Sequence, residues 1–203
     1  RANPRYGEAG HEREASSPLP GCLESLLQRS LLKKAKQDGL ASIKPVLVED
    51  PSVEKVIDRS RPALKKAFDA LSMRGSRPLF GKPNGVGIDQ LTQDFSDKKV
   101  AVEITIAPVP AVKGTVLPPV HSNLSLLDIK GAFVACQASG VAPKQTILFE
   151  EFCLCLALCG HIKYEEVEQM SAAARVAGVF ANYLGEKDEQ AVITEAVVPQ
   201  VAR

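Results

Sequence analysis

Residues 147–164, ILFEEFCLCLALCGHIKY, decide the fold class of this chain, because nothing charged occurs in them from Phe152 to Gly160. Apolar residues lie on every face of a helix formed by this segment, and such a helix must be covered on more than one side. The cover is either another protein or the helix that follows, whose apolar stripe comprises Val167, Met170, Ala174, Ala177, Phe180, Tyr183 and Leu184. The segment therefore predicts a mainly α-helical fold.

The overall composition narrows the class of protein. The 203 residues include 25 Lys and Arg against 24 Asp and Glu, a net charge of +1, which excludes a polybasic nucleic-acid binder as the default interpretation. No apolar run approaches the roughly 20 residues that a membrane-spanning helix needs. Aromatic residues make up 5% and Trp is absent, so the core is expected to be aliphatic. We expect a soluble, mostly helical protein that depends on protein partners.

Four parts are expected along the chain. Residues 1–19 are polar, carry both charge signs and lack apolar periodicity, which predicts an extended N-terminal arm. Residues 20–60 are predicted to form an N-terminal helical segment, whose first helix begins near Pro20. The central part is 61–164, and residues 165–203 are predicted to form C-terminal helices.

The first half contains clear helix signals. Gly39 ends the first helix, and Ile43–Val48 is predicted to be extended. Asp50 then supplies an N-cap and Pro51 a first helical residue. A short helix is expected to follow, and Ser60 is predicted to cap the next one. The apolar residues of these two helices are Val53, Val56 and Ile57, and then Leu64, Ala67, Phe68 and Leu71.

A loop and a connector come next. Residues 74–87 are rich in Gly and Pro and predict a loop, but Gly81-Lys82 is followed by Pro83, so the phosphate-loop pattern is absent. The helix resumes around Leu91, Phe95 and Val100. Residues 100–106 then alternate as in a short strand, after which prolines 108, 110, 118 and 119 prevent regular structure. We expect this proline-rich connector, 100–120, to contact neighbouring proteins and not the protein's own core.

The second half is more regular. Ser125 with Asp128 resembles a capping box, so Asn123-Leu124-Ser125 is interpreted as a helix cap and not as a glycosylation acceptor. The helix that follows carries the stripe Leu126, Ile129, Phe133 and Cys136. Gln137–Thr146 is a predicted loop that leads into the helix of the opening paragraph. Gly185 is expected to end the next helix, and Gln190–Val198 to form the last one.

Two units share one plan of helix, loop, β-branched residue and helix. The first runs from LKKAFDAL (64–71) to NGVGIDQLTQDF (84–95), and the second from IKGAFVAC (129–136) to TILFEEFCLCLALC (146–159). Together they resemble a pair of EF-hands of the calmodulin-like superfamily. Residues 147–164 in particular are similar to the exiting helix of degenerate EF-hand modules of ciliary and flagellar proteins. The resemblance covers 61–164 and implies an EF-hand-like helix–loop–helix pair with flanking helices.

The calcium ligands of that superfamily are not matched. Counted back from Val86, the first loop places Leu79, Gly81 and Pro83 at ligand positions one, three and five, and Gln90 at twelve. Counted back from Ile147, the second loop places Gly140, Ala142 and Lys144 there. Only Glu151 carries a carboxylate, at position twelve. One carboxylate beside a lysine cannot replace the hydration shell of a divalent cation, so we expect no bound calcium and no other metal or cofactor.

The remaining candidates for chemistry are the cysteines and histidines. Cys155 and Cys159 lie one turn apart with His161 nearby, but the second ligand pair of a zinc site is lacking, since the remote cysteines are Cys22 and Cys136. Cys153, Cys155 and Cys159 are better interpreted as reduced, buried thiols. The histidines at 11, 121 and 161 are isolated in sequence, which favours no catalytic site.

These observations favour a non-enzymatic, calcium-independent structural protein. The resemblance implies an axonemal component of a cilium or flagellum, bound to microtubules through tubulin and other axonemal proteins. The alternative is an accessory subunit of another large assembly, such as a mitochondrial complex. That alternative rests on the first residue, Arg1, because removal of an organellar transit peptide leaves an internal residue at the start.

Overall fold

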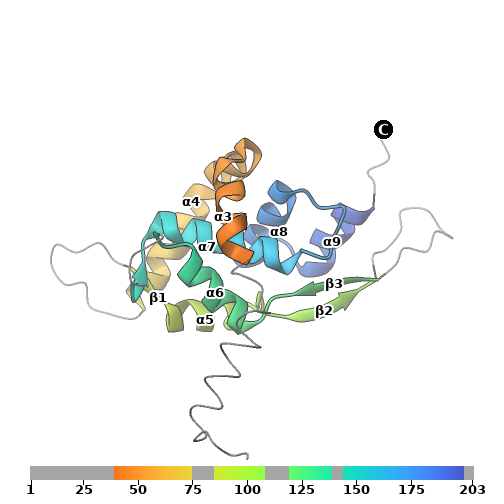
Figure 1. Ribbon diagram of the computed structural model, residues 1–203. Coiled ribbons are helices and arrows are strands. Elements are labelled where there is room, and N and C mark those ends of the chain that lie inside the picture. Colours follow the sequence, from red (N-terminus) through yellow and green to blue (C-terminus); the bar gives the residue numbers. More distant parts are fainter. Residues whose placement is uncertain (1–38, 75–84, 108–118, 139–143, 199–203) are drawn as a thin grey trace, which may run out of the picture. The chain divides into compact units, whose positions relative to one another are not determined.

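The computed structural model describes residues 39–74, 85–107, 119–138 and 144–198 (Figure 1). The chain divides into a unit of residues 1–39 and a unit of residues 40–203, and the description below concerns the second. The predicted arm and the predicted helix from Pro20 lie outside the described residues. In chain order the elements are α3 (Gly39–Glu49), α4 (Pro51–Met73), β1 (Val86–Gly87), α5 (Ile88–Asp97), β2 (Glu103–Ile106), β3 (Val120–Asn123), α6 (Leu126–Ala135), β4 (Thr146–Ile147), α7 (Phe149–Lys163), α8 (Ala172–Leu184) and α9 (Glu189–Val197).

The unit is mainly helical, as predicted, with small antiparallel sheets between the helices. α4 and α5 flank one loop, and α6 and α7 flank another. The ends of these two loops meet, because β1 pairs with β4 in an antiparallel register that places Val86 opposite Ile147. These are the two β-branched residues that precede the exiting helices in the sequence. Both are fully buried, so the pairing joins the two helix–loop–helix units at their loops.

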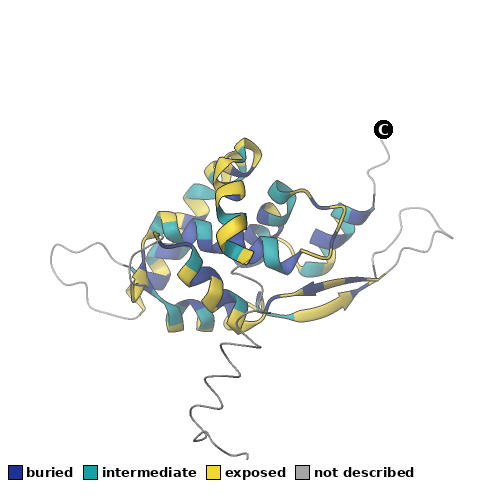
Figure 2. Cartoon of the chain, in the orientation of Figure 1, coloured by how far each residue is buried: buried dark blue, intermediate teal, exposed yellow. Residues whose placement is uncertain are grey.

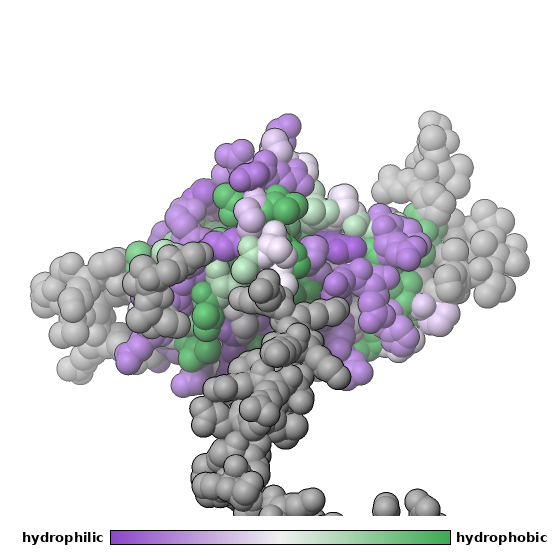
Figure 3. All heavy atoms as spheres, viewed as in Figure 1, coloured by the Kyte–Doolittle hydropathy of each residue, from purple (hydrophilic) through white to green (hydrophobic). Residues whose placement is uncertain are grey.

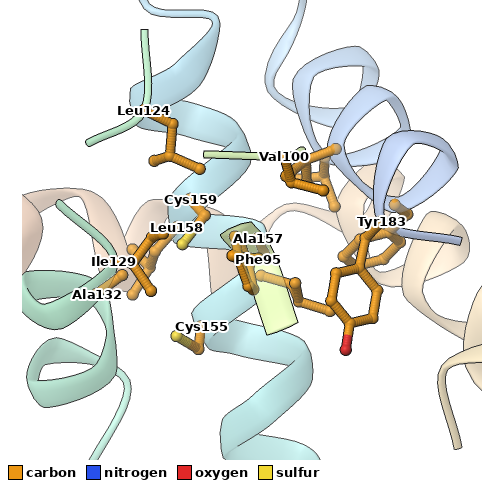
Figure 4. Close-up of a cluster of buried hydrophobic side chains, with 14 of the residues drawn as sticks. Phe95, Val100, Leu124, Ile129, Ala132, Cys155, Ala157, Leu158, Cys159 and Tyr183 are labelled. Carbon is orange, nitrogen blue, oxygen red and sulfur yellow. The ribbon is translucent and has the colours of Figure 1, made fainter. Parts of the chain in front are cut away.

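Helix α7 is the centre of the core. It packs against α8, α6 and α4, and every residue from Cys155 to Gly160 is buried. In Figure 4, Ile129 and Ala132 of α6 lie to one side of α7, and Tyr183 of α8 lies to the other. The structure therefore confirms that the all-round apolar helix is covered on several sides, and that the following helix is one of its covers.

The start of α4 confirms the predicted cap, but the predicted break at Ser60 is wrong. The Asp50 side chain accepts a hydrogen bond from the Ser52 N–H, and Pro51 occupies the first turn. The helix then continues without interruption to Met73, although Pro62 lies inside it. Pro62 removes one backbone hydrogen bond, but one apolar face runs along the whole helix and its burial against α7 and α8 outweighs that loss.

The predicted extended stretch Ile43–Val48 is also wrong, because it lies within helix α3. Its β-branched residues favour a strand locally. However, Leu40, Ile43 and Leu47 recur at helical spacing, and all three pack on the core. The ammonium group of Lys44 donates a hydrogen bond to the backbone carbonyl of Gln137, which ties α3 to the end of α6.

Helix α5 ends at Asp97, before Val100. Lys99 adopts a left-handed conformation with φ of 55°, and the Val100 N–H donates to the Phe95 carbonyl at 2.9 Å. This arrangement is a Schellman-type helix end. A side chain is strained at a positive φ of this size, so the turn that directs Val100 into the core is held by the surrounding contacts.

The connector differs from the prediction in its first part. β2 pairs with β3 in an antiparallel register from Glu103 opposite Asn123 to Ile106 opposite Val120. Val100 and Ile106 are buried, so the expectation that this part avoids the protein's own core is wrong for 100–107. The physical reason is that the prolines begin only at residue 108, beyond the ladder. Most of β2 is exposed (Figure 2), and 108–118 lie outside the described residues.

The C-terminal helices end close to the predicted positions, but α8 begins later than predicted. Ser171 caps α8 through the Ala174 N–H, and Gly185 ends it at a φ of 72°. Residues 167–170, which were expected within this helix, form the turn before it. Asp188 caps α9 through the Ala191 N–H. The predicted capping box at the start of α6 is confirmed as well.

Three phenylalanines of the apolar stripes are buried in the core: Phe68, Phe133 and Phe152. Phe149 is only half-buried, because it lies in the first turn of α7, beyond the cover of α8. The stripe on α6 is correct except for Leu126, which is exposed.

Candidate functional site

The joined loops are the first candidate site, and both exiting helices start in the same way. Gln90 and Glu151 each lie four residues after the paired residue of their loop. The Gly87 N–H donates to Gln90 Oε1 at 2.8 Å, and the Leu148 N–H donates to Glu151 Oε2 at 2.9 Å. Each side chain thus satisfies a backbone donor at a helix N-terminus that has no partner within the helix.

The second carboxylate oxygen of Glu151 is also engaged. Its Oε1 accepts a hydrogen bond from Lys144 Nζ at 2.9 Å. Partial burial opposes ionisation of Glu151, but the Leu148 N–H and the Lys144 ammonium group outweigh it and lower the pKa of the carboxyl group below its ordinary value. Both oxygens of this carboxylate are therefore bound by the protein's own donors.

This arrangement does not fit calcium. A calcium loop presents a bidentate carboxylate and several further oxygen ligands to the ion, whereas Glu151 faces an ammonium group and a backbone N–H. The residue at the equivalent position of the first loop is Gln90, which is neutral and caps α5. Of positions one, three and five of the two loops, only Lys144 lies within the described residues. Their residue types supply no carboxylate.

The cysteines of the described residues are buried: Cys136, Cys155 and Cys159 lie together, and Cys153 lines the side of α7 that faces α3 and α4. Cys136, Cys153, Cys155 and Cys159 are free and buried, and Cys22 lies outside the described residues. The neighbouring thiols of Cys136 and Cys159, together with complete burial, raise the pKa of the Cys155 thiol well above the ordinary value. Zinc binds thiolates, so a neutral thiol at Cys155 agrees with the structural interpretation. In the described part of the chain, no group of three His, Cys, Asp or Glu residues could hold a metal ion.

The histidines are not assembled into a catalytic arrangement in the described ranges, and His11 lies outside them. The ring Nδ1 of His121 is 2.9 Å from the hydroxyl of Thr105 across the β2–β3 hairpin. His161 lies on α7, where burial and the nearby charge of Arg175 lower its pKa, and its Nδ1 has no hydrogen-bond partner.

A buried lysine joins four elements, which the sequence did not predict. Lys163 ends α7, and its Nζ donates to the Val100 carbonyl at 2.9 Å, to Asn182 Oδ1 at 3.0 Å, and to Glu189 Oε2 at 2.7 Å. The Ser122 hydroxyl donates to the other oxygen of Glu189 at 2.6 Å. Burial lowers the pKa of Lys163, although Glu189 opposes the shift. All three ammonium protons have acceptors, so the group holds α9 and the hairpin against α7 and α8.

A second buried polar group links α5 to α8. Asp94 is 4% exposed. It accepts a hydrogen bond from the Tyr183 hydroxyl at 2.6 Å and forms ion pairs with Lys98 at 2.8 Å and Arg74 at 3.3 Å. Burial and this hydrogen bond raise the pKa of the Tyr183 hydroxyl. The Lys98 ammonium group also lies 3.5 Å from the centre of the Tyr183 ring. The sequence carried no signal for this pair, because Asp94 and Tyr183 are 89 residues apart.

The second candidate site is an apolar groove between α3, α4 and α7, which we call the α3–α4–α7 groove. Its volume is about 310 Å³. Its apolar lining includes Leu47, Val48, Val53, Ile57, Leu154 and Ala157. A smaller hollow of about 220 Å³ lies between α8 and α9. The sequence did not indicate the groove, since its walls come from three segments and α3 was expected to be extended.

Comparison of the chain with models of protein families, with characterised proteins and with solved structures finds no match. Within the described ranges, no helix has the length and apolar character needed to cross a membrane.

Proposed function

We propose that this chain is a non-enzymatic protein-binding module built on an EF-hand-like pair that works without calcium. The observation that carries the proposal is the double engagement of Glu151. This residue caps α7 through the Leu148 N–H and pairs with Lys144, so the contacts that calcium would supply at the start of the exiting helix come from the chain itself. The pair is then a rigid block at any calcium concentration.

The packing of the helices supports a structural role. The β1–β4 pairing joins the two units, and α8 packs against both α7 and α4. Two of the buried titratable groups, Lys163 and Asp94, are fully engaged in holding helices together. Such groups position elements of the fold and leave no free acid, base or nucleophile there for catalysis.

The location that we propose for the module is the axoneme of a cilium or flagellum, with tubulin and other axonemal proteins as partners. This part of the proposal rests on the resemblance of residues 147–164 to degenerate ciliary EF-hand modules. An accessory subunit of another large assembly, such as a mitochondrial complex, is the alternative. Imaging of the tagged protein in its source cell would distinguish the axoneme from a mitochondrial complex. Co-sedimentation of the protein with tubulin would support the axonemal location.

Calcium titration tests the core of the proposal. Isothermal titration of the full chain with millimolar calcium is expected to show no saturable binding, and circular dichroism no change in helix content. The matched variant is Glu151→Gln, which removes the carboxylate and keeps the shape of the side chain. Micromolar binding by the wild type that disappears in this variant would show that the module is a calcium sensor, and the proposal would be wrong.

A further inference from the structure

The α3–α4–α7 groove has an apolar floor that the described residues leave partly uncovered. Leu47 and Val53 form part of it and are buried, whereas Ile57 and Leu154 are only half-buried. α8 covers α7 and α4 elsewhere, but none of the residues that line the groove belongs to α8. The groove is therefore open to a ligand, and its volume of about 310 Å³ lies within the range of binding pockets, roughly 300–1,000 Å³.

Helix α3 contributes an exposed apolar side chain to the groove. Val48 lines the groove and is 60% exposed. Figure 3 shows hydrophobic side chains in the region of α3. An exposed apolar residue at an apolar groove is surface that a protein ligand can cover.

The charges at the rim indicate the chemistry of the ligand. Three carboxylates line the groove, those of Glu54, Asp58 and Glu150, against the one guanidinium of Arg61. Arg61 pairs with Glu150 at 2.6 Å and with Asp58 at 3.4 Å, so the rim keeps an excess of negative charge. Glu54 has no ion pair among the described residues. A complementary ligand is cationic.

The hollow between α8 and α9 lacks this signature. Its charged lining residues are Lys187 and Glu195, which pair with each other at 2.6 Å. Its rim is thus balanced in charge, and it selects no ligand by charge.

We propose that the α3–α4–α7 groove binds a segment of a partner protein that inserts aliphatic side chains into the floor and places Lys or Arg beside the acidic rim. The inference rests on the proposed function and names the docking surface of the module. The aliphatic side chains of the partner cover the exposed parts of Val48, Ile57 and Leu154, and its cations lie beside Glu54 and the carboxylates paired with Arg61.

The probe is a fluorescein-labelled synthetic peptide in which pairs of Leu alternate with Lys, which we call the Leu–Lys peptide. Two matched peptides serve as controls. In the Glu peptide, Glu replaces each Lys, and in the Ser peptide, Ser replaces each Leu. The full chain labelled with ¹⁵N is titrated with each. The Leu–Lys peptide is expected to shift the amide signals of Val48, Glu54 and Leu154, and to leave those of Ala177 and Val192 beside the other hollow unchanged. The matched peptides are expected to bind at least about tenfold more weakly, which corresponds to a loss of about 1.4 kcal/mol or more in the free energy of binding.

Two pairs of variants locate the site. Val48→Asp places a charge in the groove, and Val46→Asp places the same charge at a residue of the same helix with nearly the same exposure that does not line the groove. Glu54→Lys reverses a rim charge, and Glu166→Lys makes the same change at an exposed residue outside it. Val48→Asp and Glu54→Lys are expected to weaken the Leu–Lys peptide about tenfold or more, and the two controls less than about twofold.

The proposal is overturned if the Leu–Lys peptide does not bind, if the Glu peptide binds as well, or if each control variant loses as much affinity as its partner. The proposed function has a separate readout. The chain could show no calcium binding and enter its assembly equally well with and without Val48→Asp. The proposed function would then stand, and the proposal of this docking surface would be wrong.

Discussion

Phe152 is the residue whose truncation tests the packing of the helices most directly. Its side chain is fully buried. The centre of its ring lies 5.3 Å from the ring centre of Phe68 on α4 and 5.8 Å from that of Tyr183 on α8. Phe152→Ala removes a buried ring at the junction of three helices. The expected loss in the free energy of unfolding is about 4–5 kcal/mol, at the upper end of the range for Phe→Ala, since two aromatic contacts are lost as well.

Phe149→Ala is the matched control. Phe149 has the same residue type, lies one turn away on the same helix and contacts the same Phe68 ring at 5.6 Å, but it is only half-buried. We expect a loss of roughly 1–2 kcal/mol there, because part of the ring stays in water in either state. The two sites differ in burial, in the contact with Tyr183, and in the cations of Arg61 and Lys65 that lie over the Phe149 ring.

Urea unfolding followed by circular dichroism measures both losses. With a slope of about 2 kcal/mol/M, Phe152→Ala lowers the midpoint by roughly 2 M and Phe149→Ala by roughly 0.5–1 M. Most domains have only about 5–15 kcal/mol of stability, so Phe152→Leu provides a milder variant if Phe152→Ala does not fold. Equal losses for Phe149→Ala and Phe152→Ala, or a loss under about 1 kcal/mol at Phe152, would refute the packing of α7 between α4 and α8.

Three further predictions concern the helix contact, the buried lysine and the helix cap. Gly160→Ala is expected to lower the free energy of unfolding by roughly 1–3 kcal/mol, because the added Cβ would lie 2.6 Å from a methyl group of α8. Gly131→Ala is the control, since its Cβ would meet one side-chain atom at 3.6 Å. We expect thermal unfolding to show no change for Gly131→Ala or a gain of up to about 1 kcal/mol. Lys163→Met is expected to lower the free energy of unfolding in urea by roughly 3–5 kcal/mol, because it leaves the carboxylate of Glu189 without its partner. The double variant Lys163→Met with Glu189→Gln is expected to recover part of that loss. Equal stability of the single and double variants would contradict this explanation. Glu151→Gln is expected to cost roughly 0.5–1.5 kcal/mol at pH 7. Because the pKa of Glu151 is lowered by folding from 4.5, its ionised form contributes stability above about pH 4.5 that is lost as the pH falls through the folded pKa, so the wild type and the variant should converge in acid; a difference that persists at pH 2 would argue against the cap and the ion pair as its cause.

The sequence predicted the parts of the fold that depend on neighbouring residues along the chain. The caps at Asp50 and Ser125 and the helix end at Gly185 follow from a side chain or a glycine that satisfies backbone groups a few residues away. The paired residues Val86 and Ile147 were evident as the β-branched residue before each exiting helix. The EF-hand-like character of the pair and the proposed assembly stay predictions.

Local signals failed where burial by distant residues decided the outcome. Ile43–Val48 has strand-forming residues, and Ser60 and Pro62 suggest a helix boundary, yet both stretches are helical because their apolar faces pack on the core. The first part of the connector likewise joins the fold, since β3 pairs with it. A sequence pattern cannot show which partner covers an element, and the cover determined its conformation here.

By itself, the sequence determined that this protein is mainly helical and that residues 152–160 belong to a helix covered on several sides, because these residues present no charged face to water. Only the tertiary structure decided which helices cover it, how Lys163 could be buried, and where an apolar groove stays open. Lys163 and the carbonyl of Val100 are 63 residues apart in the chain, and the walls of the α3–α4–α7 groove come from three separate helices. Such features arise when distant residues pack together, and the free energy of that packing is not encoded in any one segment.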